Sequence, residues 1–390
     1  MKTGRGSRIE SVRAHLAGPG GERVREVARA ALGEPHASLG GWEAVPLRGE
    51  RGALDVARSL MLVRGVARVG REERPWSAVL KTSAPAAGQE DPGGIGYWKR
   101  EALLYRSGAL DDLPAGLRPV RCYGVDEPGE RVVWLWLEHV REEGDPDWPL
   151  ARWGLAARHL GRFNGAFLVG RPLPRREWLG GRRLRTWLAH HHVLVERIAA
   201  APDNPAVRHW WPRPVVDGVL RLWAEREAFL DALERLPQTL CHGDAIRRNL
   251  FARRTADGGE ETVAIDWEFA GHFAPGEEVG QTLSVASAFY DVAPADLPAL
   301  DEALFAGYLA GLRDVGWRGD ERPVRFAYAA HAALRNAFNA VGATPANEAG
   351  RAGALANYGR TWEELAARRA DLRPFLLGLA DEARALMARL

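Results

Sequence analysis

Two parts of the chain differ in how their hydrophobic residues are spaced. Between residues 41 and 138, short apolar runs alternate with turns that contain glycine or proline, a pattern that predicts β-strands. From about residue 150 onward, apolar residues recur every three or four positions, which predicts amphipathic helices. The sequence therefore predicts an α+β protein, in which a sheet-rich region is followed by a mostly helical one.

A helical segment precedes the predicted strands. Apolar residues recur at helical spacing over residues 8–33, and Gly18-Pro19-Gly20-Gly21 divides this segment into two pieces. Strands are predicted over residues 59–63, 66–69, 75–81, 120–125 and 131–137, and the last two would form a hairpin around residues 126–129. Helices are predicted over residues 97–107, 151–168, 187–200, 214–236, 296–315, 324–341 and 358–390.

Length and composition limit the class of protein. A chain of 390 residues is long for one hydrophobic core and suits two lobes. The net charge of +2 gives no electrostatic basis for binding nucleic acid or a membrane. No apolar run follows the basic N-terminus or is long enough to span a bilayer, so we expect a cytoplasmic protein. Cys122 and Cys241 match no metal-binding spacing, and free thiols are expected.

The most specific motif in the chain is His242-Gly243-Asp244, followed five residues later by Asn249. By average composition, this spacing of histidine, glycine, aspartate and asparagine arises by chance in about one chain of this length in several hundred. Capping and closing a turn are common roles for aspartate and asparagine. A purely structural role of these two residues would not explain why the chain also carries other polar residues suited to the same chemistry, which are described next.

One of these further residues is Asp266, which ends a strand predicted over residues 262–265. The stretch thus places one carboxylate, one amide and a second carboxylate on two loops next to strands. These are the groups that hold magnesium and orient a hydroxyl for phosphoryl transfer.

A second pair of candidate residues belongs to the sheet-rich region. Lys81 ends an apolar strand, and Glu101 lies twenty residues later on the helix predicted over residues 97–107. A lysine there could be a solvated surface residue. A strand lysine paired with a glutamate on the next helix is also the arrangement that positions the α- and β-phosphates of a nucleotide in kinase-like folds. A phosphate-covering loop would then lie between Leu47 and Ser59.

The last strand of the sheet-rich region is continuously apolar and ends at Glu138-His139-Val140. In a kinase-like fold this segment is the hinge, where backbone groups of Glu138 and Val140 would hydrogen-bond adenine.

Taken together, these residues resemble the aminoglycoside phosphotransferase and choline kinase group of the protein-kinase-like fold. The resemblance covers about residues 40–290. It is carried by the His242–Asn249 loop, by Ile265-Asp266-Trp267-Glu268 where protein kinases have Asp-Phe-Gly, and by the Lys81 and Glu101 segments. One departure is Gly276-Glu277-Glu278-Val279-Gly280, which stands where the family often carries an acidic residue followed by Leu-Ala.

The resemblance implies a bilobal fold and assigns roles to the residues. Residues 1–39 would be a helical extension, 40–140 a nucleotide-binding lobe, and 141–390 a helical lobe that carries the catalytic loops and the acceptor site. Asp244 would be the catalytic residue, and Asn249 and Asp266 would ligate Mg²⁺. Lys81, Glu101, Glu138 and Val140 would bind ATP, with GTP left open as the donor. We expect a monomer or a homodimer.

The acceptor is expected to be a small molecule that carries a sugar. Residues 145–240 have a net charge of about +5 and residues 241–390 about −5, which suits a neutral or anionic acceptor better than a polycation. A nucleoside antibiotic of the capuramycin type is favoured, because the sequences of residues 75–81 and 97–110 also resemble a subgroup of the family that includes kinases of such antibiotics.

Other functions remain as alternatives. An aminoglycoside would fit if Glu277, Glu278, Asp291 and Asp296 clustered at the acceptor site. A choline or fructosamine-type metabolite is a second alternative acceptor. A binding module that keeps the fold without turnover is a non-enzymatic alternative, disfavoured because the catalytic residues are all present. His190-His191-His192 are adjacent and cannot share one helix face, which argues against a metal site there.

Overall fold

The computed structural model describes residues 3–47 and 58–390. Contacts between Cα atoms divide the chain into two compact units. Unit 1 comprises Met1–Leu110 and Pro119–Arg141, and unit 2 comprises Asp111–Arg118 and Glu142–Leu390. Unit 1 contains the larger sheet and unit 2 most of the helices, so the predicted α+β class is confirmed.

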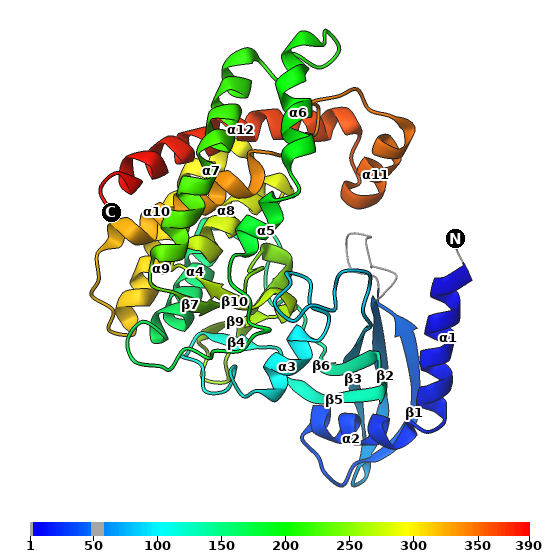
Figure 1. The fold of residues 1–390 in the computed structure, drawn as a ribbon. Coiled ribbons are helices and arrows are strands. Elements are labelled where there is room, and N and C mark those ends of the chain that lie inside the picture. Colours follow the sequence, from blue (N-terminus) through cyan, green and yellow to red (C-terminus); the bar gives the residue numbers. More distant parts are fainter. Residues whose placement is uncertain (1–2, 48–57) are drawn as a thin grey trace. The chain divides into compact units, whose positions relative to one another are not determined.

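The sheet of unit 1 has five antiparallel strands in the order β1-β2-β3-β6-β5 (Figure 1). Its strands are β1 (Ser38–Pro46), β2 (Arg58–Val69), β3 (Glu72–Ser83), β5 (Cys122–Gly129) and β6 (Val132–Glu138). Sequence neighbours pair as hairpins except that β3 pairs with β6, which brings the end of β3 beside the start of β6. A short helix, α3 (Arg100–Arg106), follows β3.

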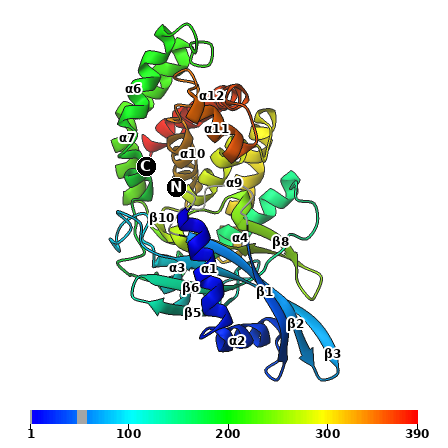
Figure 2. The same ribbon diagram turned by 90° about the vertical axis from the view of Figure 1, so that its right-hand side faces the viewer.

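Two N-terminal helices, α1 (Thr3–Ala17) and α2 (Gly21–Leu32), pack against this sheet (Figure 1, Figure 2). The break between them falls at Gly18–Gly20, as the sequence predicts. Leu16 and Val24 are fully buried, and they share one hydrophobic core with Met61 and Trp136 from the strands. Burial of apolar surface by both helices therefore covers one face of the sheet.

Two details of the sheet differ from the prediction. The segments 59–63 and 66–69 form one continuous strand, which includes Gly65. Gly65 lies opposite a bulge in β1, and a Cβ atom at position 65 would come within 2.4 Å of the Gly41 carbonyl oxygen. The hairpin turn falls at residues 130–131 rather than at 126–129, because Gly129 still pairs with Val132. The Asp126 carboxylate is held by the Trp136 indole N–H at 2.8 Å, which keeps this segment in the strand.

Unit 2 contains two small sheets and a set of helices. The order β4-β9-β8 joins β4 (Leu117–Pro119), β9 (Glu260–Ala264) and β8 (Leu250–Arg254), and β7 (Thr239–Cys241) pairs with β10 (Gly271–Phe273). The helices are α4 (Leu150–Ala166), α5 (Arg183–Leu188), α6 (His192–Ala200), α7 (Arg213–Arg235), α8 (Glu277–Ala288), α9 (Leu297–Asp314), α10 (Glu321–Asn336), α11 (Glu348–Tyr358) and α12 (Trp362–Met387).

Most predicted helices are confirmed, with three corrections. The helix predicted over residues 187–200 is divided into α5 and α6. The last helix begins at Trp362 rather than at residue 358, because Thr361 and Glu364 form a capping box. Helix α8, which no periodic pattern indicated, has all of its residues buried. No helix among the described residues is long and apolar enough to cross a membrane.

Helices α4 and α9 approach each other closely through glycines. A Cβ atom at Gly161 would lie 2.2 Å from the Tyr308 oxygen, and one at Gly311 would lie 2.0 Å from the Arg158 oxygen. Backbone therefore packs on backbone, and a methyl group cannot be added without moving the helices apart.

We expect Gly161→Ala to lower the free energy of unfolding by about 1–3 kcal/mol, because the added methyl group overpacks the α4–α9 contact. Gly378→Ala is the matched control, since Gly378 lies within α12 with open space around its Cα. That control should be neutral or stabilising by up to about 1 kcal/mol, because alanine favours the helix. Urea unfolding of both variants checks this, and equal stability of the two would contradict the close approach.

Candidate active site

In unit 1, Lys81 and Glu101 form a buried ion pair. Their Nζ and Oε2 atoms lie 2.6 Å apart, and the two side chains are 10% and 4% exposed. Lys81 projects from β3 opposite Leu135 of β6, and Glu101 lies in the first turn of α3. The sheet and the helix thus hold the lysine ammonium at a fixed position, which is what a phosphate-binding lysine requires.

The predicted hinge lies at the end of β6. The Glu138 N–H donates to the Arg121 oxygen at 2.8 Å, so the group that Glu138 could offer to a base is its carbonyl oxygen. Val140 lies two residues beyond the strand end. The loop expected to cover the phosphates, between Leu47 and Ser59, falls on residues 48–57, which lie outside the described residues.

In unit 2, the loop after β7 is fixed by His242. Its Nδ1 accepts from the Asp244 N–H at 3.2 Å, and its Nε2 lies 2.7 Å from the Ile265 oxygen. Because Nδ1 accepts, the proton is on Nε2, which donates to that oxygen. Burial lowers the pKa of His242, which is consistent with a neutral ring. The imidazole therefore ties the loop to the residue that precedes Asp266.

Gly243 is required by both space and conformation. Its φ is +77°, and a Cβ atom would lie 2.1 Å from the Phe269 oxygen. Its N–H donates to Glu278 Oε1 at 2.8 Å. Glu278 is fully buried at the start of α8, and burial raises the pKa of its carboxyl to about 7. The sharp turn before Asp244 is thus held from the protein interior.

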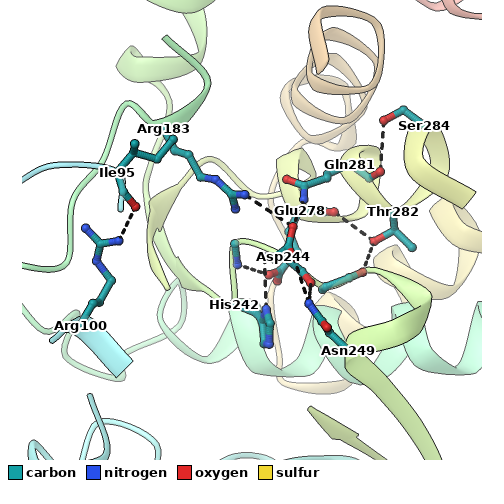
Figure 3. Close-up of polar contacts among 12 residues, drawn as sticks. Ile95, Arg100, Arg183, His242, Asp244, Asn249, Glu278, Gln281, Thr282 and Ser284 are labelled. Atoms are coloured by element: carbon teal, nitrogen blue, oxygen red, sulfur yellow. Dashed lines mark hydrogen bonds and ion pairs between the residues drawn. The ribbon is translucent and has the colours of Figure 1, made fainter. Parts of the chain in front are cut away.

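The Asp244 carboxylate is held on both of its oxygens (Figure 3). Oδ1 accepts from Gln281 Nε2 at 2.7 Å and lies 3.5 Å from an Arg183 nitrogen, while Oδ2 accepts from Asn249 Nδ2 at 3.0 Å. Its side chain is 18% exposed. A carboxylate that is oriented on both oxygens but still reached by solvent can accept a proton from a bound hydroxyl.

Asn249 and Asp266 lie at one end of the β8–β9 hairpin. The Ile265 N–H donates to the backbone carbonyl oxygen of Asn249 at 2.9 Å. Asp266 therefore directly follows the residue that pairs with Asn249. The Asn249 Nδ2 is used by Asp244, which leaves its Oδ1 as the side-chain acceptor. Asp266 has a φ of +63°, a left-handed conformation that is uncommon for a residue other than glycine and concentrates at functional sites.

Several residues around this loop were not found from the sequence. Gln281 and Glu278 come from α8, and Thr282 of the same helix donates to the Ala245 oxygen at 2.6 Å. Arg183 lies beside Arg182 and near Arg185 in the chain, and no motif sets it apart from them. Its neighbour Arg185 instead pairs with acidic residues of α7, at 2.6 Å from Asp231 and 2.7 Å from Glu234.

Two of the four acidic residues on which the aminoglycoside alternative depended, Glu277 and Glu278, have partners inside the protein. Glu278 binds the Gly243 N–H, and Glu277 accepts from the Ala274 N–H at 2.8 Å and pairs with His331 at 2.9 Å. Both glutamates are buried. Their charges are used inside the protein and do not face a solvent-accessible surface.

The family of this chain follows from a comparison of its sequence with known families. A model of APH, the phosphotransferase enzyme family, matches residues 115–319, which is more than half of the chain and includes the loop from His242 to Asp266. The chain belongs to the APH phosphotransferase family. The predicted resemblance is thereby confirmed at the level of the family, and the protein is a phosphotransferase. The capuramycin-type subgroup stays a prediction.

Other comparisons describe what this APH phosphotransferase is similar to. No curated protein sequence matches it. An amicoumacin kinase solved with AMP-PNP and Ca²⁺ is 12% identical, with 86% of this chain and 90% of that chain covered and a TM-score of 0.46. A choline kinase from Cryptosporidium parvum is 12% identical (89% and 90% covered, TM-score 0.48). An aminoglycoside phosphotransferase from Alicyclobacillus acidocaldarius is 14% identical (89% and 95% covered, TM-score 0.47).

The raised pKa of Glu278 predicts how stability depends on pH. Between the ordinary glutamate pKa of about 4.5 and the folded value of about 7, the folded state retains a proton that the unfolded state releases, so stability falls as pH rises. Glu278→Gln removes this term. The unfolding free energy of the variant minus that of the wild type should therefore rise by on the order of 2 kcal/mol from pH 5 to pH 7.

Urea unfolding at several pH values measures this difference. Glu302→Gln on α9 is the control, because Glu302 is exposed and its substitution should give a difference that does not change with pH. A Glu278→Gln difference that is equally flat would show that the buried carboxyl is ionised throughout.

Proposed function

We propose that this APH phosphotransferase transfers the γ-phosphate of ATP to a hydroxyl group of a small molecule that carries a sugar. The acceptor oxygen forms a bond to the γ-phosphorus, the bond from that phosphorus to the β–γ bridging oxygen breaks, and ADP leaves. The hydroxyl proton passes to the Asp244 carboxylate. The observation that carries this proposal is the position of Asp244, which is oriented on both oxygens and partly exposed, within the region that matches the family.

Asn249 and Asp266 fit a magnesium site. One amide oxygen and one carboxylate at the end of a hairpin are the hard oxygen ligands that Mg²⁺ prefers, and Mg²⁺ usually takes only one or two protein ligands beside phosphate oxygens and water. Over residues 3–47 and 58–390, no group of three or more His, Cys, Asp or Glu side chains could hold a metal ion, which suits an ion held jointly with a nucleotide. When bound, Mg²⁺ would neutralise charge on the phosphates.

The nucleotide is assigned to residues 40–140 and the acceptor to residues 141–390. Lys81, held by Glu101 at 2.6 Å, would bind the α- and β-phosphates. The backbone of Glu138 and Val140 would bind the base, which we expect to be adenine.

We propose an antibiotic as the acceptor, with a neutral or anionic nucleoside of the capuramycin type favoured by the positive charge of residues 145–240. Use of Glu277 and Glu278 inside the protein weighs against an aminoglycoside. A choline or fructosamine-type metabolite is a further alternative acceptor. A panel of nucleoside antibiotics, aminoglycosides, macrolides and choline, followed by ADP release, distinguishes these acceptors.

Asp244→Asn should lower kcat for the accepted substrate by about 100-fold or more, because the amide cannot take the hydroxyl proton. Affinity for AMP-PNP should be unchanged. Asp257→Asn is the control, since Asp257 lies in the exposed turn between β8 and β9 and its loss should not affect kcat. Normal turnover by Asp244→Asn would refute the catalytic assignment, and no turnover by the wild type with any acceptor would favour a binding module.

Asp266→Ala should weaken AMP-PNP binding in the presence of Mg²⁺ by about tenfold or more, because one of two protein ligands is lost. Binding measured with EDTA should be nearly the same for the variant and the wild type. Calorimetric titrations with and without Mg²⁺ make this comparison. An unchanged magnesium dependence would mean that the metal is held by other residues.

A further inference from the structure

Two arginines beside Asp244 have no role in the proposed phosphoryl transfer. Arg183 is the first residue of α5, and Arg335 lies in the last turn of α10. Arg335 stacks on the Trp187 ring, with 4.0 Å between the guanidinium carbon and the ring centroid. Trp187 is one helical turn after Arg183 on α5, so the two side chains project from the same side of that helix. The two guanidinium groups and the indole therefore belong to one cluster.

Arg183 is mostly buried, and its hydrogen-bond donors are incompletely satisfied. Its guanidinium carbon lies 3.9 Å from the Phe269 ring centroid, and its side chain is 12% exposed. One nitrogen is at 3.5 Å from Asp244 Oδ1, which is long for an ion-pair hydrogen bond. Its Nη1 is buried and has no hydrogen-bond partner among residues 3–47 and 58–390. A desolvated charged donor without a partner is costly, which indicates a group that a ligand completes.

Within the described part of the chain, Arg335 forms no ion pair with a carboxylate, and its guanidinium group stacks on the Trp187 ring. Burial, together with the positive charge of Arg183, lowers the pKa of Arg335 to about 10. The two arginines thus repel each other in a largely desolvated site, where electrostatic interactions are strong.

The nearby acids do not balance these charges. Asp244 is the acid that acts on both arginines. Glu268 and Glu278 also act on Arg183, but the pKa of Glu278 is about 7, so that carboxyl is partly neutral. Arg369 adds a third positive charge that acts on Arg335. The cluster therefore has an excess of positive charge.

We propose that the acceptor carries an anionic group, a carboxylate or a phosphate, and that Arg183 and Arg335 bind this group so that a neighbouring hydroxyl lies at Asp244. This inference rests on the proposed function. Arg–carboxylate and Arg–phosphate pairs are strong and directional because the planar guanidinium donates in a fixed geometry. Trp187, which is 38% exposed, would contact the sugar or base of the same molecule. A quaternary ammonium or a polycation would be repelled.

Acceptors that differ in one group test the charge preference. One set is uridine 5′-carboxylate, uridine 5′-carboxamide, 5′-amino-5′-deoxyuridine and uridine 5′-phosphate, and a second set is glucuronate, glucuronamide, glucosamine and glucose 6-phosphate. ADP release gives kcat/KM for each. We expect the acid or the phosphate ester to exceed its amide partner by about 10- to 100-fold and the amine to be the poorest. Equal use of acid, amide and amine, or preference for the amine, overturns the anion site.

Substitution of Arg335 tests the assignment to this residue. Arg335→Gln should raise KM for the anionic acceptor about tenfold and abolish the preference over the amide, with KM for ATP unchanged, while Arg335→Lys should retain part of the preference. Arg322→Gln is the control, because Arg322 lies at the exposed start of the same helix and pairs with Asp320. A raised KM for ATP with an unchanged acceptor preference would assign Arg335 to the nucleotide phosphates and overturn the proposal.

A binding measurement extends the test to the case in which no member of either set is phosphorylated. With the protein saturated by AMP-PNP and Mg²⁺, sulfate should raise the thermal midpoint more than chloride of equal ionic strength. This difference should be larger for the wild type than for Arg335→Gln, because the general stabilisation by sulfate acts on both proteins alike. An equal difference in the two proteins overturns the anion site. The proposed function fails separately. It fails if none of the acceptors leads to consumption of ATP and if Asp244→Asn leaves any residual ATP hydrolysis unchanged.

Discussion

The hydrogen bond from the Gly243 N–H to Glu278 fixes the turn on which the candidate site depends. It measures 2.8 Å and lies in the interior, where a backbone donor without a partner would be costly. Helix α8 contributes two more contacts within the next turn, from Gln281 to the Asp244 carboxylate and from Thr282 to the Ala245 oxygen. Since α8 packs against α9 and α10, the orientation of Asp244 is determined by the core of unit 2.

The same network links the candidate base to the candidate metal ligands. His242 accepts from the Asp244 N–H and donates to the Ile265 oxygen, so the loop after β7 and the end of β9 cannot shift independently. Asn249 donates to Asp244 and accepts from the Ile265 N–H. A general base and a metal ion must lie at a set separation for phosphoryl transfer, and two residues that each contact both loops provide this constraint without a bound ligand.

The sequence predicted candidate residues that are local in the chain. In unit 2, His242, Asp244 and Asn249 lie within eight residues, and a motif indicates them. In unit 1, Lys81 lies near the end of a strand and Glu101 in the first turn of a helix, so periodicity indicates this pair. The sequence did not predict α8, because every residue of that helix is buried and a helix without a solvent-exposed face shows no amphipathic period. The roles of Glu278 and Gln281 were therefore missed with it.

Arg183 was visible only as one of several charges, and nothing in the sequence separates it from Arg185, which pairs with acids of α7. Arg183 differs from Arg185 because tertiary contacts place it beside the loop after β7. The proposed acceptor specificity would thus depend on long-range packing, whereas the reaction is indicated by a short motif.

The claim that Asp244, Asn249 and Asp266 form the centre of a metal-dependent phosphotransferase is tested most directly by crystals grown with AMP-PNP and Mn²⁺. Anomalous scattering locates the manganese ion without reference to any expected geometry. The account predicts an ion bound by Asn249 Oδ1 and the Asp266 carboxylate, with the γ-phosphate of the analogue facing Asp244. An ion or a nucleotide bound away from these three side chains would contradict it.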